Sequence, residues 1–413
     1  MTGPLEGVRI FDLTRILAGP SCTQILADLG AEVIKIERPG IGDDTRRFAP
    51  PFIRDADNND TTESAYYLAV NRNKQSITLD LTQKAGQDIA RKLIAKSDVL
   101  VENFKTGGLS KYGLGYDDLK DDFPHLVYCS ITGFGHTGPY ATRPGYDLLL
   151  QGMSGLMSCT GDPKGEPMKS AVPVADLMAG MYAAVGINAA LRHKEITNEG
   201  QHIDIGMLDV MVAFSSVMGM NYLATGKLPE RMGNAHPNIV PYQAFETADG
   251  NIILAVGNDG QYQRFCNFAS IPELGTDPRY AKNSGRLAHR DELVMKIRAV
   301  IKEKPSNYWL EGLQKEGVSC GPINNLQQVF EDPQVIARGL KAEVEHPLTK
   351  GRPVSLLRSP LRLSKTPVKE PIAPPVIGSH TDSVLTDLLG FGRDEIDNLR
   401  ELLACQEMER TSA

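Results

Sequence analysis

Short runs of β-branched and aliphatic residues alternate with helical patterns through the first half of the chain. A strand is predicted at Gly7–Leu13, a helix at Ser21–Leu29 with Pro20 near its start and Gly30 after its end, and a second strand at Ala31–Glu37. Further strands are predicted at Ser76–Asp80, Asp98–Glu102, Leu126–Ile131 and Gln201–Ile205, and a helix at Gln83–Ala95 with Thr82 as its cap. This alternation predicts an α/β fold, a doubly wound, mostly parallel sheet of the Rossmann type.

A lone carboxylate stands where an extended segment meets a long helical pattern. Asp176 follows Ser170–Ala175 and precedes an almost wholly small or apolar stretch that runs to about His193. Aspartate is a favoured N-cap, because its side chain accepts a hydrogen bond from an orphan backbone N–H. The helix dipole also favours a carboxylate anion, and a rigidly held carboxylate can attack an activated acyl group. The pattern leaves both roles open, and they are compatible.

The second half of the chain has a different composition. We expect a large α/β domain over 1–225, a smaller α+β domain over 226–330, and a segment over 331–413 that returns to the large domain. The smaller domain should contain a hairpin over Ala244–Val256, signalled by Asp-Gly, and helices at 261–268 and 290–303. Beyond Pro333 a proline-rich strap is expected, closed by an amphipathic helix over Asp394–Cys405.

Composition and charge narrow the class of protein. The 413 residues carry a formal net charge of −7, which disfavours a nucleic-acid binder. The six cysteines have no CxxC spacing, so we expect neither a disulfide framework nor a structural metal site. With no signal-peptide pattern and no run of 18 apolar residues, the sequence indicates no membrane association and a cytoplasmic protein, or a mitochondrial-matrix one if the source is eukaryotic.

Common nucleotide and hydrolase motifs are missing. The turn Thr14–Pro20 lacks the GxGxxG glycines, so nicotinamide binding is disfavoured although Glu37 ends the second strand. No P-loop, HExxH or GxSxG is present. Instead, basic residues follow several predicted strands, where α/β sheets bind ligands. Phe104 could cover an adenine. The basic residues could bind phosphates, or they could be ordinary solvated surface charges; they are Arg38, Arg72, Lys74 and Lys105.

These segments together resemble the class III CoA-transferases, which include formyl-CoA transferase and belong to the same superfamily as α-methylacyl-CoA racemase. The matching motifs run in order along nearly the whole chain: Asp12–Pro20, Leu29–Gly40, Asn71–Lys74, Val101–Phe104, Ser130–Gly135, Thr137–Pro139 and Gly378–Thr381. The resemblance implies that Asp176 is the nucleophile and that coenzyme A is substrate and product rather than a tightly bound cofactor. It also implies an interlocked homodimer, with each subunit threaded through a hole in the other.

The resemblance further implies a set of site residues. Contacts to CoA are expected from Ile16, Arg38, Val70, Arg72, Lys74, Asn103, Phe104, Lys111 and Tyr112. The closest likeness within the family is to members that use dicarboxylic acids, with succinyl-CoA as donor and glutarate as acceptor. The second carboxylate then needs a partner, for which Arg15, His236, Arg47 and Tyr146 are candidates. Arg15 could instead pair with Asp12 or Glu37.

Two alternatives are weighed against CoA transfer. A 2-methylacyl-CoA racemase would carry a catalytic histidine where this chain has Tyr146, and a tyrosine hydroxyl, with an ordinary pKa of about 10, is a poor substitute for imidazole. A non-catalytic CoA-binding protein would show CoA affinity without either activity. The glycine-rich loop of formyl-CoA transferase has no counterpart near His236–Asn238, which disfavours oxalate and formyl-CoA as substrates.

Overall fold

The computed structural model describes residues 3–399, and the chain divides into two compact units. The larger unit comprises residues up to 156, residues 169–227 and the chain from 338 onward; the smaller unit comprises 157–168 and 228–337. The segment 157–168 lies in the smaller unit, although composition groups it with the large domain. Each unit has its own hydrophobic core.

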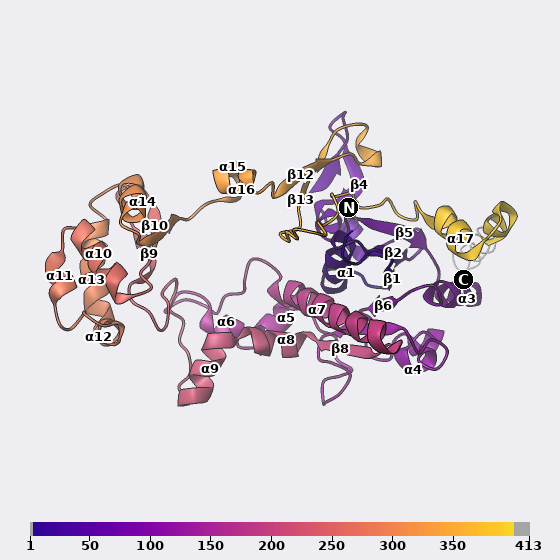
Figure 1. Ribbon diagram of the computed structural model, residues 1–413, viewed down its shortest axis with the longest axis horizontal. Coiled ribbons are helices and arrows are strands. Elements are labelled where there is room, and N and C mark those ends of the chain that lie inside the picture. The colour runs from indigo at the N-terminus through magenta and orange to yellow at the C-terminus, as the bar shows by residue number, and fades with distance from the viewer. Residues whose placement is uncertain (1–2, 400–413) are drawn as a thin grey trace. The chain divides into compact units, whose positions relative to one another are not determined.

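The larger unit is built on a six-stranded sheet (Figure 1). Its strands are β1 (Arg9–Asp12), β2 (Glu32–Glu37), β5 (Lys74–Thr78), β6 (Val99–Glu102), β7 (Val127–Thr132) and β8 (His202–Gly206). They lie in the order β5-β2-β1-β6-β7-β8, and every neighbouring pair is parallel. Counted in chain order this is 3-2-1-4-5-6, the arrangement of dinucleotide-binding sheets. The predicted parallel α/β sheet is confirmed.

Helices cover both faces of this sheet. One core cluster joins the strands to α1 (Ala18–Asp28), α5 (Asp147–Met153), α7 (Val174–Thr197) and α8 (Met207–Phe214). The other cluster joins them to α3 (Lys84–Ile94), α4 (Tyr116–Leu119) and α17 (Thr381–Leu389). Buried aliphatic side chains on the strands point alternately to these two clusters, as a sheet covered on both faces requires.

The long helix α7 packs closely against α1. A Cβ atom added at Gly180 would lie 2.1 Å from Ser21 Oγ and 2.6 Å from Ala18 O, so the absence of a side chain permits this approach. By length and composition alone α7 could cross a membrane, as could the bent pair α8 and α9 (Ser216–Thr225), but 44% of the apolar α7 window is buried inside the structure. Core packing accounts for much of that apolar composition.

Two predicted helix caps are wrong. Helix α7 begins at Val174 with Pro173 as its N-cap residue, so Asp176 lies within the first turn. Helix α3 has Gln83 at its N-cap, while the hydroxyl of Thr82 bonds the carboxylate of Asp80. In both cases the helix starts one to three residues away from the polar side chain that suggested a cap.

The remaining elements of the larger unit are short. They are η1 (Asp44–Arg47), β3 (Phe52–Arg54), β4 (Asp60–Ser64), α2 (Ala65–Ala69), η2 (Ser110–Tyr112), β12 (Lys341–Val344), η3 (Pro347–Thr349) and β13 (Val354–Leu357). The pairs β3–β4 and β12–β13 are antiparallel. The predicted proline-rich strap is bonded to the first half of the chain, where Lys369 N donates to Asp28 O and Ile372 N to Asn73 Oδ1. The predicted closing helix is present to residue 399, and 400–405 lie outside the described residues.

The smaller unit contains a three-stranded antiparallel sheet in the order β11-β10-β9. The predicted hairpin is confirmed, with β9 (Tyr242–Glu246) and β10 (Asn251–Ala255) joined through Asp249-Gly250 and β11 (Ser319–Pro322) added at the edge. Its helices include α10 (Asp259–Phe268), α11 (Pro272–Thr276), α12 (Asn283–Ala288), α13 (Arg290–Ile301), α14 (Ser306–Lys315), α15 (Leu326–Glu331) and α16 (Pro333–Ala337). The short α6 (Leu156–Cys159) stands where the chain passes from one unit to the other.

Candidate active site

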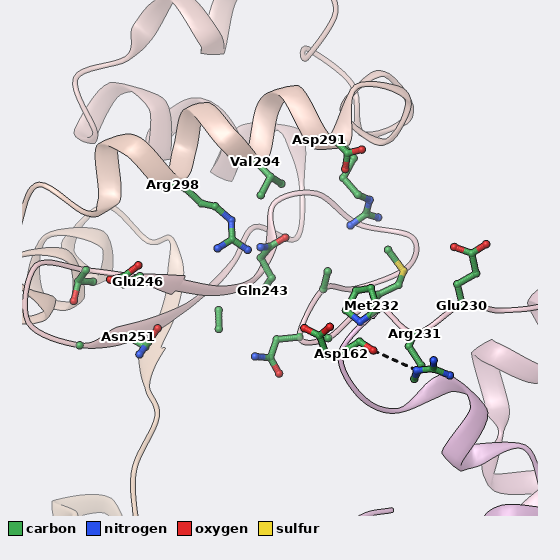
Figure 2. Close-up of a pocket in the computed structure, with 18 of the residues that line it drawn as sticks. Asp162, Glu230, Arg231, Met232, Gln243, Glu246, Asn251, Asp291, Val294 and Arg298 are labelled. Atoms are coloured by element: carbon green, nitrogen blue, oxygen red, sulfur yellow. Dashed lines mark hydrogen bonds between the residues drawn. The ribbon is translucent and has the colours of Figure 1, made fainter. Parts of the chain in front are cut away.

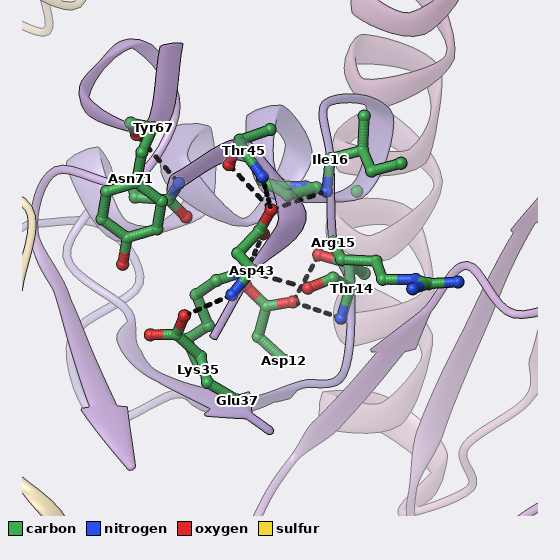
Figure 3. Close-up of polar contacts among 12 residues, drawn as sticks. Asp12, Thr14, Arg15, Ile16, Lys35, Glu37, Asp43, Thr45, Tyr67 and Asn71 are labelled. Atoms are coloured by element: carbon green, nitrogen blue, oxygen red, sulfur yellow. Dashed lines mark hydrogen bonds and ion pairs between the residues drawn. The ribbon is translucent and has the colours of Figure 1, made fainter. Parts of the chain in front are cut away.

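The loop after β1 is held from below by a buried ion pair (Figure 3). Lys35 Nζ lies 2.8 Å from Asp43 Oδ2 and donates to Thr14 O at 2.8 Å. Asp43 Oδ1 accepts from the backbone N–H of Ile16 at 3.2 Å. Ile16 has φ +70°, a left-handed conformation that is unfavourable for a β-branched residue. The buried charges therefore fix a strained loop at the carboxyl end of β1.

Three of the expected CoA contacts, Val70, Arg72 and Lys74, are buried. Lys74 Nζ lies 3.3 Å from Asp12 Oδ2 and donates to Asn71 Oδ1, and burial lowers the pKa of Lys74 to about 8. The Arg72 guanidinium forms a bidentate pair with Asp28. Val70 is also buried in the core. In this structure both cations have carboxylate partners, and their contacts to CoA stay a prediction.

Two neighbouring cavities lie above the loop. The Arg38 cavity has a volume of about 340 Å³ and is lined by Arg38, Phe104 and Tyr112 among others. The Lys111 ammonium lies 4.6 Å from the centre of the Tyr112 ring. The second, which we call the Asp176 cavity, has a volume of about 160 Å³ and contains Asp176. Arg15 and Phe104 line both cavities, so the two are adjacent.

The Asp176 cavity brings together several predicted residues from distant segments. Ile16, Asn103 and Tyr146 line it, and Tyr146 is 66% exposed. The Asn103 side chain accepts from Arg15 N at 3.0 Å and donates to Arg15 O at 2.7 Å, which joins the loops after β1 and β6. The carboxyl ends of these parallel strands thus form one edge, as expected for a ligand site in an open α/β sheet.

The start of α7 is held by side chains that the sequence did not single out. Asp147 Oδ1 accepts from Ala175 N at 2.8 Å, and Asp147 Oδ2 accepts from Gln151 Nε2 at 2.7 Å. The fully buried Gln151 in turn accepts from Ser170 N at 2.8 Å. Asp147, which lies on α5, therefore accepts a hydrogen bond from an N–H of the first turn of α7. The carboxyl of Asp176 is not needed for this bond, and it lines the cavity.

Burial raises the pKa of the Asp176 carboxyl to about 7, and the negative charge of Asp147 adds to this effect. The helix dipole favours the ionised form of Asp176, whereas desolvation and the charge of Asp147 favour its protonated form. A poorly solvated carboxylate that ionises near neutral pH is typical of a functional site.

We expect Asp176 to destabilise the folded protein at alkaline pH. Its folded-state pKa lies above the unfolded value, so the folded state binds more protons between about pH 4 and 7 and the contribution of Asp176 to stability falls as pH rises through that window. Asp176→Asn removes this charge and should stabilise the larger unit by about 1–2 kcal/mol at pH 8, after allowance for solvent screening. Thermal unfolding at pH 5 and pH 8 measures this change in stability. Asp121→Asn, at an exposed position, is the control. Equal melting shifts for the two variants at pH 8 would contradict it.

The candidates for the second carboxylate are scattered. Arg15 pairs with Asp44 at 3.1 Å, so the expected alternatives Asp12 and Glu37 are wrong as its partners. Arg47 is exposed and lines neither cavity. His236 belongs to the smaller unit, where its Nδ1 accepts from Asn238 N at 3.0 Å. One cation of the Asp176 cavity was missed, Arg143, although it stands in a loop that follows a predicted strand.

The smaller unit contains a cavity of its own, of about 1080 Å³ (Figure 2). Arg231 Nε donates to the carbonyl of Asp162 at 3.2 Å, and the side chains of Arg298 on α13 and Gln243 on β9 lie close to each other. None of the residues predicted from sequence as site residues lines this cavity. Within residues 3–399 no group of three or more His, Cys, Asp or Glu side chains is placed to hold a metal ion.

Comparison with known proteins agrees with this geometry. The model of CoA-transferase family III matches residues 5–381. The chain is 48% identical over 385 residues to a succinate–glutarate CoA-transferase of Agrobacterium fabrum, covering 93% of this chain and 96% of that protein. It is 45% identical over 396 residues to a succinyl-CoA:glutarate CoA-transferase of Homo sapiens, covering 96% and 88%.

Solved structures give the same assignment. The crystal structure of a CAIB/BAIF family protein from Brucella suis matches with a TM-score of 0.82 at 46% identity and covers 94% of this chain and 100% of that one. The motifs, the fold and the relatives agree over nearly the whole chain. The chain therefore belongs to CoA-transferase family III and is an enzyme that transfers CoA.

Proposed function

We propose that the enzyme moves CoA from succinyl-CoA, or another dicarboxylic acyl-CoA, to a free dicarboxylic acid such as glutarate. The observation that carries the mechanism is the carboxyl of Asp176, with its raised pKa, in a small cavity that adjoins the larger Arg38 cavity. The substrates are suggested by the names of the relatives that are 45% and 48% identical to this chain.

In the proposed reaction Asp176 attacks the thioester carbonyl, which forms a mixed anhydride and expels CoA thiolate. The thiolate then attacks the aspartyl carbonyl, which gives an aspartyl-CoA thioester and releases the donor acid. The acceptor carboxylate attacks that thioester, and the same two steps run in reverse with the new acyl group. Each step exchanges one activated acyl bond for another, so the activation of the thioester is conserved. Water must be kept out, because both intermediates hydrolyse readily.

The surrounding residues have separate roles in this proposal. Asp147 and Gln151 hold the segment that carries Asp176. CoA would lie from the Arg38 cavity to the Asp176 cavity, in contact with residues of both: Ile16, Arg38, Asn103, Phe104 and Tyr112, with Lys111 over Tyr112. Arg38 supplies charge for the phosphates, and Phe104 lies at the junction. Arg72 and Lys74, which pair with Asp28 and Asp12, stay predicted CoA contacts.

We also propose that the enzyme is a homodimer with interlocked subunits. Large apolar side chains are exposed along α7, α8 and α9, including Val185 at 68%, Val212 at 56% and Leu223 at 74%. Exposed apolar residues gathered on adjacent helices are typical of a protein–protein interface. Light scattering should give about twice the chain mass of 45.1 kDa, and a monomer would contradict the proposal.

The substrate proposal predicts formation of glutaryl-CoA. Purified enzyme with succinyl-CoA and a panel of mono- and dicarboxylic acids should produce new CoA esters from the dicarboxylic acids, detected by mass spectrometry. A racemase would instead exchange the α-hydrogen of a 2-methylacyl-CoA in deuterium oxide. Exchange without transfer, or CoA binding without either reaction, would contradict the proposal.

A further inference from the structure

Three cationic side chains line the Asp176 cavity, and they are not equivalent. Arg15 is paired with Asp44 at 3.1 Å. Lys105 and Arg143 form no ion pair with a carboxylate of residues 3–399. Lys105 also lines another cavity, which neither Arg15 nor Arg143 lines. Arg143 is therefore the guanidinium of the Asp176 cavity that has no carboxylate partner among the described residues, and the residue is exposed.

The Arg143 side chain is held without using its N–H donors. Its guanidinium carbon lies 3.9 Å from the centre of the Tyr140 ring, and Tyr140 meets Phe134 edge-on at 5.5 Å. The backbone N–H of Arg143 donates to Tyr140 O at 2.9 Å, which fixes the turn beneath the pair. A cation–π contact of this kind uses no N–H donor, and the N–H groups of a guanidinium match the two oxygens of a carboxylate.

Arg15 lines both cavities, but two other cations line one cavity each. Arg38 lines only the Arg38 cavity, whereas Arg143 lines only the Asp176 cavity. If the phosphates of CoA lie near Arg38 and the thioester lies at Asp176, the acyl group lies in the Asp176 cavity, which Arg143 also lines. A monocarboxylic acyl chain ends there in a methyl group, and a dicarboxylic one ends in a carboxylate.

We propose that Arg143 binds the distal carboxylate of the acyl group and so determines the preference for dicarboxylic over monocarboxylic substrates. This inference rests on the proposed function. A charge-assisted, bidentate hydrogen bond to a carboxylate is among the strong side-chain contacts. Arg143→Gln should therefore lower kcat/KM for glutarate by about 30- to 100-fold relative to pentanoate, which has the same chain length but no second carboxylate. Arg143→Lys keeps the positive charge but not the paired N–H donors, so its preference for glutarate should lie between those of the wild type and Arg143→Gln.

The matched control is Lys105→Gln, which removes a second unpaired cation from the same cavity. The wild type, Arg143→Gln, Arg143→Lys and Lys105→Gln are compared with succinyl-CoA as common donor, so any effect on the donor step cancels in the ratio of the two acceptors. Binding is measured separately in an Asp176→Asn background, as the ratio of Kd for pentanoyl-CoA to Kd for glutaryl-CoA. We expect Arg143→Gln to reduce this ratio by about 30-fold or more and to leave the Kd for pentanoyl-CoA within about threefold.

The results for these variants test the role of Arg143 separately from the proposed function. Equal weakening of both CoA esters by Arg143→Gln would mean that Arg143 binds CoA itself and would overturn the inference. An unchanged ratio in Arg143→Gln, or a ratio lost in Lys105→Gln instead, would also overturn it. If the wild type forms no new CoA ester, the proposed function fails, while the binding ratio still tests Arg143. Transfer with an unchanged ratio overturns the inference and leaves the proposed function standing.

Discussion

Replacement of Asp176 by alanine should abolish CoA transfer while the protein keeps its fold. Asp176 is the carboxyl group of its cavity that is both poorly solvated and free of a hydrogen bond to the start of α7, since Asp147 serves that N–H. Loss of a covalent nucleophile leaves no partial route through the anhydride, so we expect turnover to fall by about 10⁴-fold or more. Conversion of succinyl-CoA to glutaryl-CoA is the measurement.

Chemical trapping separates a nucleophile from a merely positioning residue. Hydroxylamine added during turnover should modify the Asp176 side chain in the wild type, because it cleaves anhydrides and thioesters. The Asp176→Ala variant should show no modification, and the exposed Asp121→Asn control should behave as the wild type. Circular dichroism and light scattering test that the variants keep the wild-type fold and mass. Transfer above about 1% of wild type in Asp176→Ala, or label on another residue, would end the proposal.

The strands and the position of Asp176 could be predicted from sequence because both depend on local patterns. The strands of the parallel sheet contain short runs or alternations of β-branched and aliphatic residues, most clearly in β2, β6 and β7, and Asp176 stands at the junction of an extended segment and a helix. The partners of Asp176 could not be predicted in this way. Asp147 is 29 positions earlier in the numbering, and only the packing of α5 against α7 brings it to Ala175 N.

The interaction partners of charged residues were the feature least predictable from sequence. Arg72 and Lys74 follow a loop pattern typical of phosphate binding, yet both are buried in ion pairs with Asp28 and Asp12. Whether a lysine faces solvent or a buried carboxylate depends on which segments meet in three dimensions. Arg143 shows the opposite case, because a cation in an ordinary loop becomes the free guanidinium of a cavity only after folding.

Lys35→Met, a substitution on strand β2, should strongly destabilise the larger unit. Lys35 is fully buried, and although burial opposes its charge, the carboxylates of Asp43 and Asp12 outweigh that effect and raise its pKa. Removal of one partner leaves an uncompensated buried carboxylate, so the free energy of unfolding of the larger unit should fall by about 3–5 kcal/mol. The exposed Lys84, paired with Asp88 on the surface of α3, is the matched control, and Lys84→Met should lose less than about 0.5 kcal/mol.

Urea unfolding can assign the loss to the correct unit. Trp309, the one tryptophan of the chain, is buried in the smaller unit, so its fluorescence reports that unit, whereas far-ultraviolet circular dichroism reports both. Lys35→Met should shift the circular dichroism transition and leave the fluorescence transition near its wild-type midpoint. Lys35→Met/Asp43→Asn should recover part of the loss, because the amide still accepts from Ile16 N without an unpaired charge. A shift of equal size in Lys84→Met would contradict the assignment.

Lys35→Met should weaken CoA binding as well as lower stability. Lys35 holds Thr14 O and, through Asp43, the N–H of Ile16, which keeps Ile16 at φ +70°. Without that support the strained backbone should relax, and Arg15 and Ile16 would leave the walls of the two cavities. At a temperature where all variants are folded, Lys35→Met should weaken CoA binding by about tenfold or more, while Lys84→Met should leave it unchanged. Unaltered CoA affinity in Lys35→Met would mean that the buried pair supports the fold alone and that the strained loop is held by other contacts.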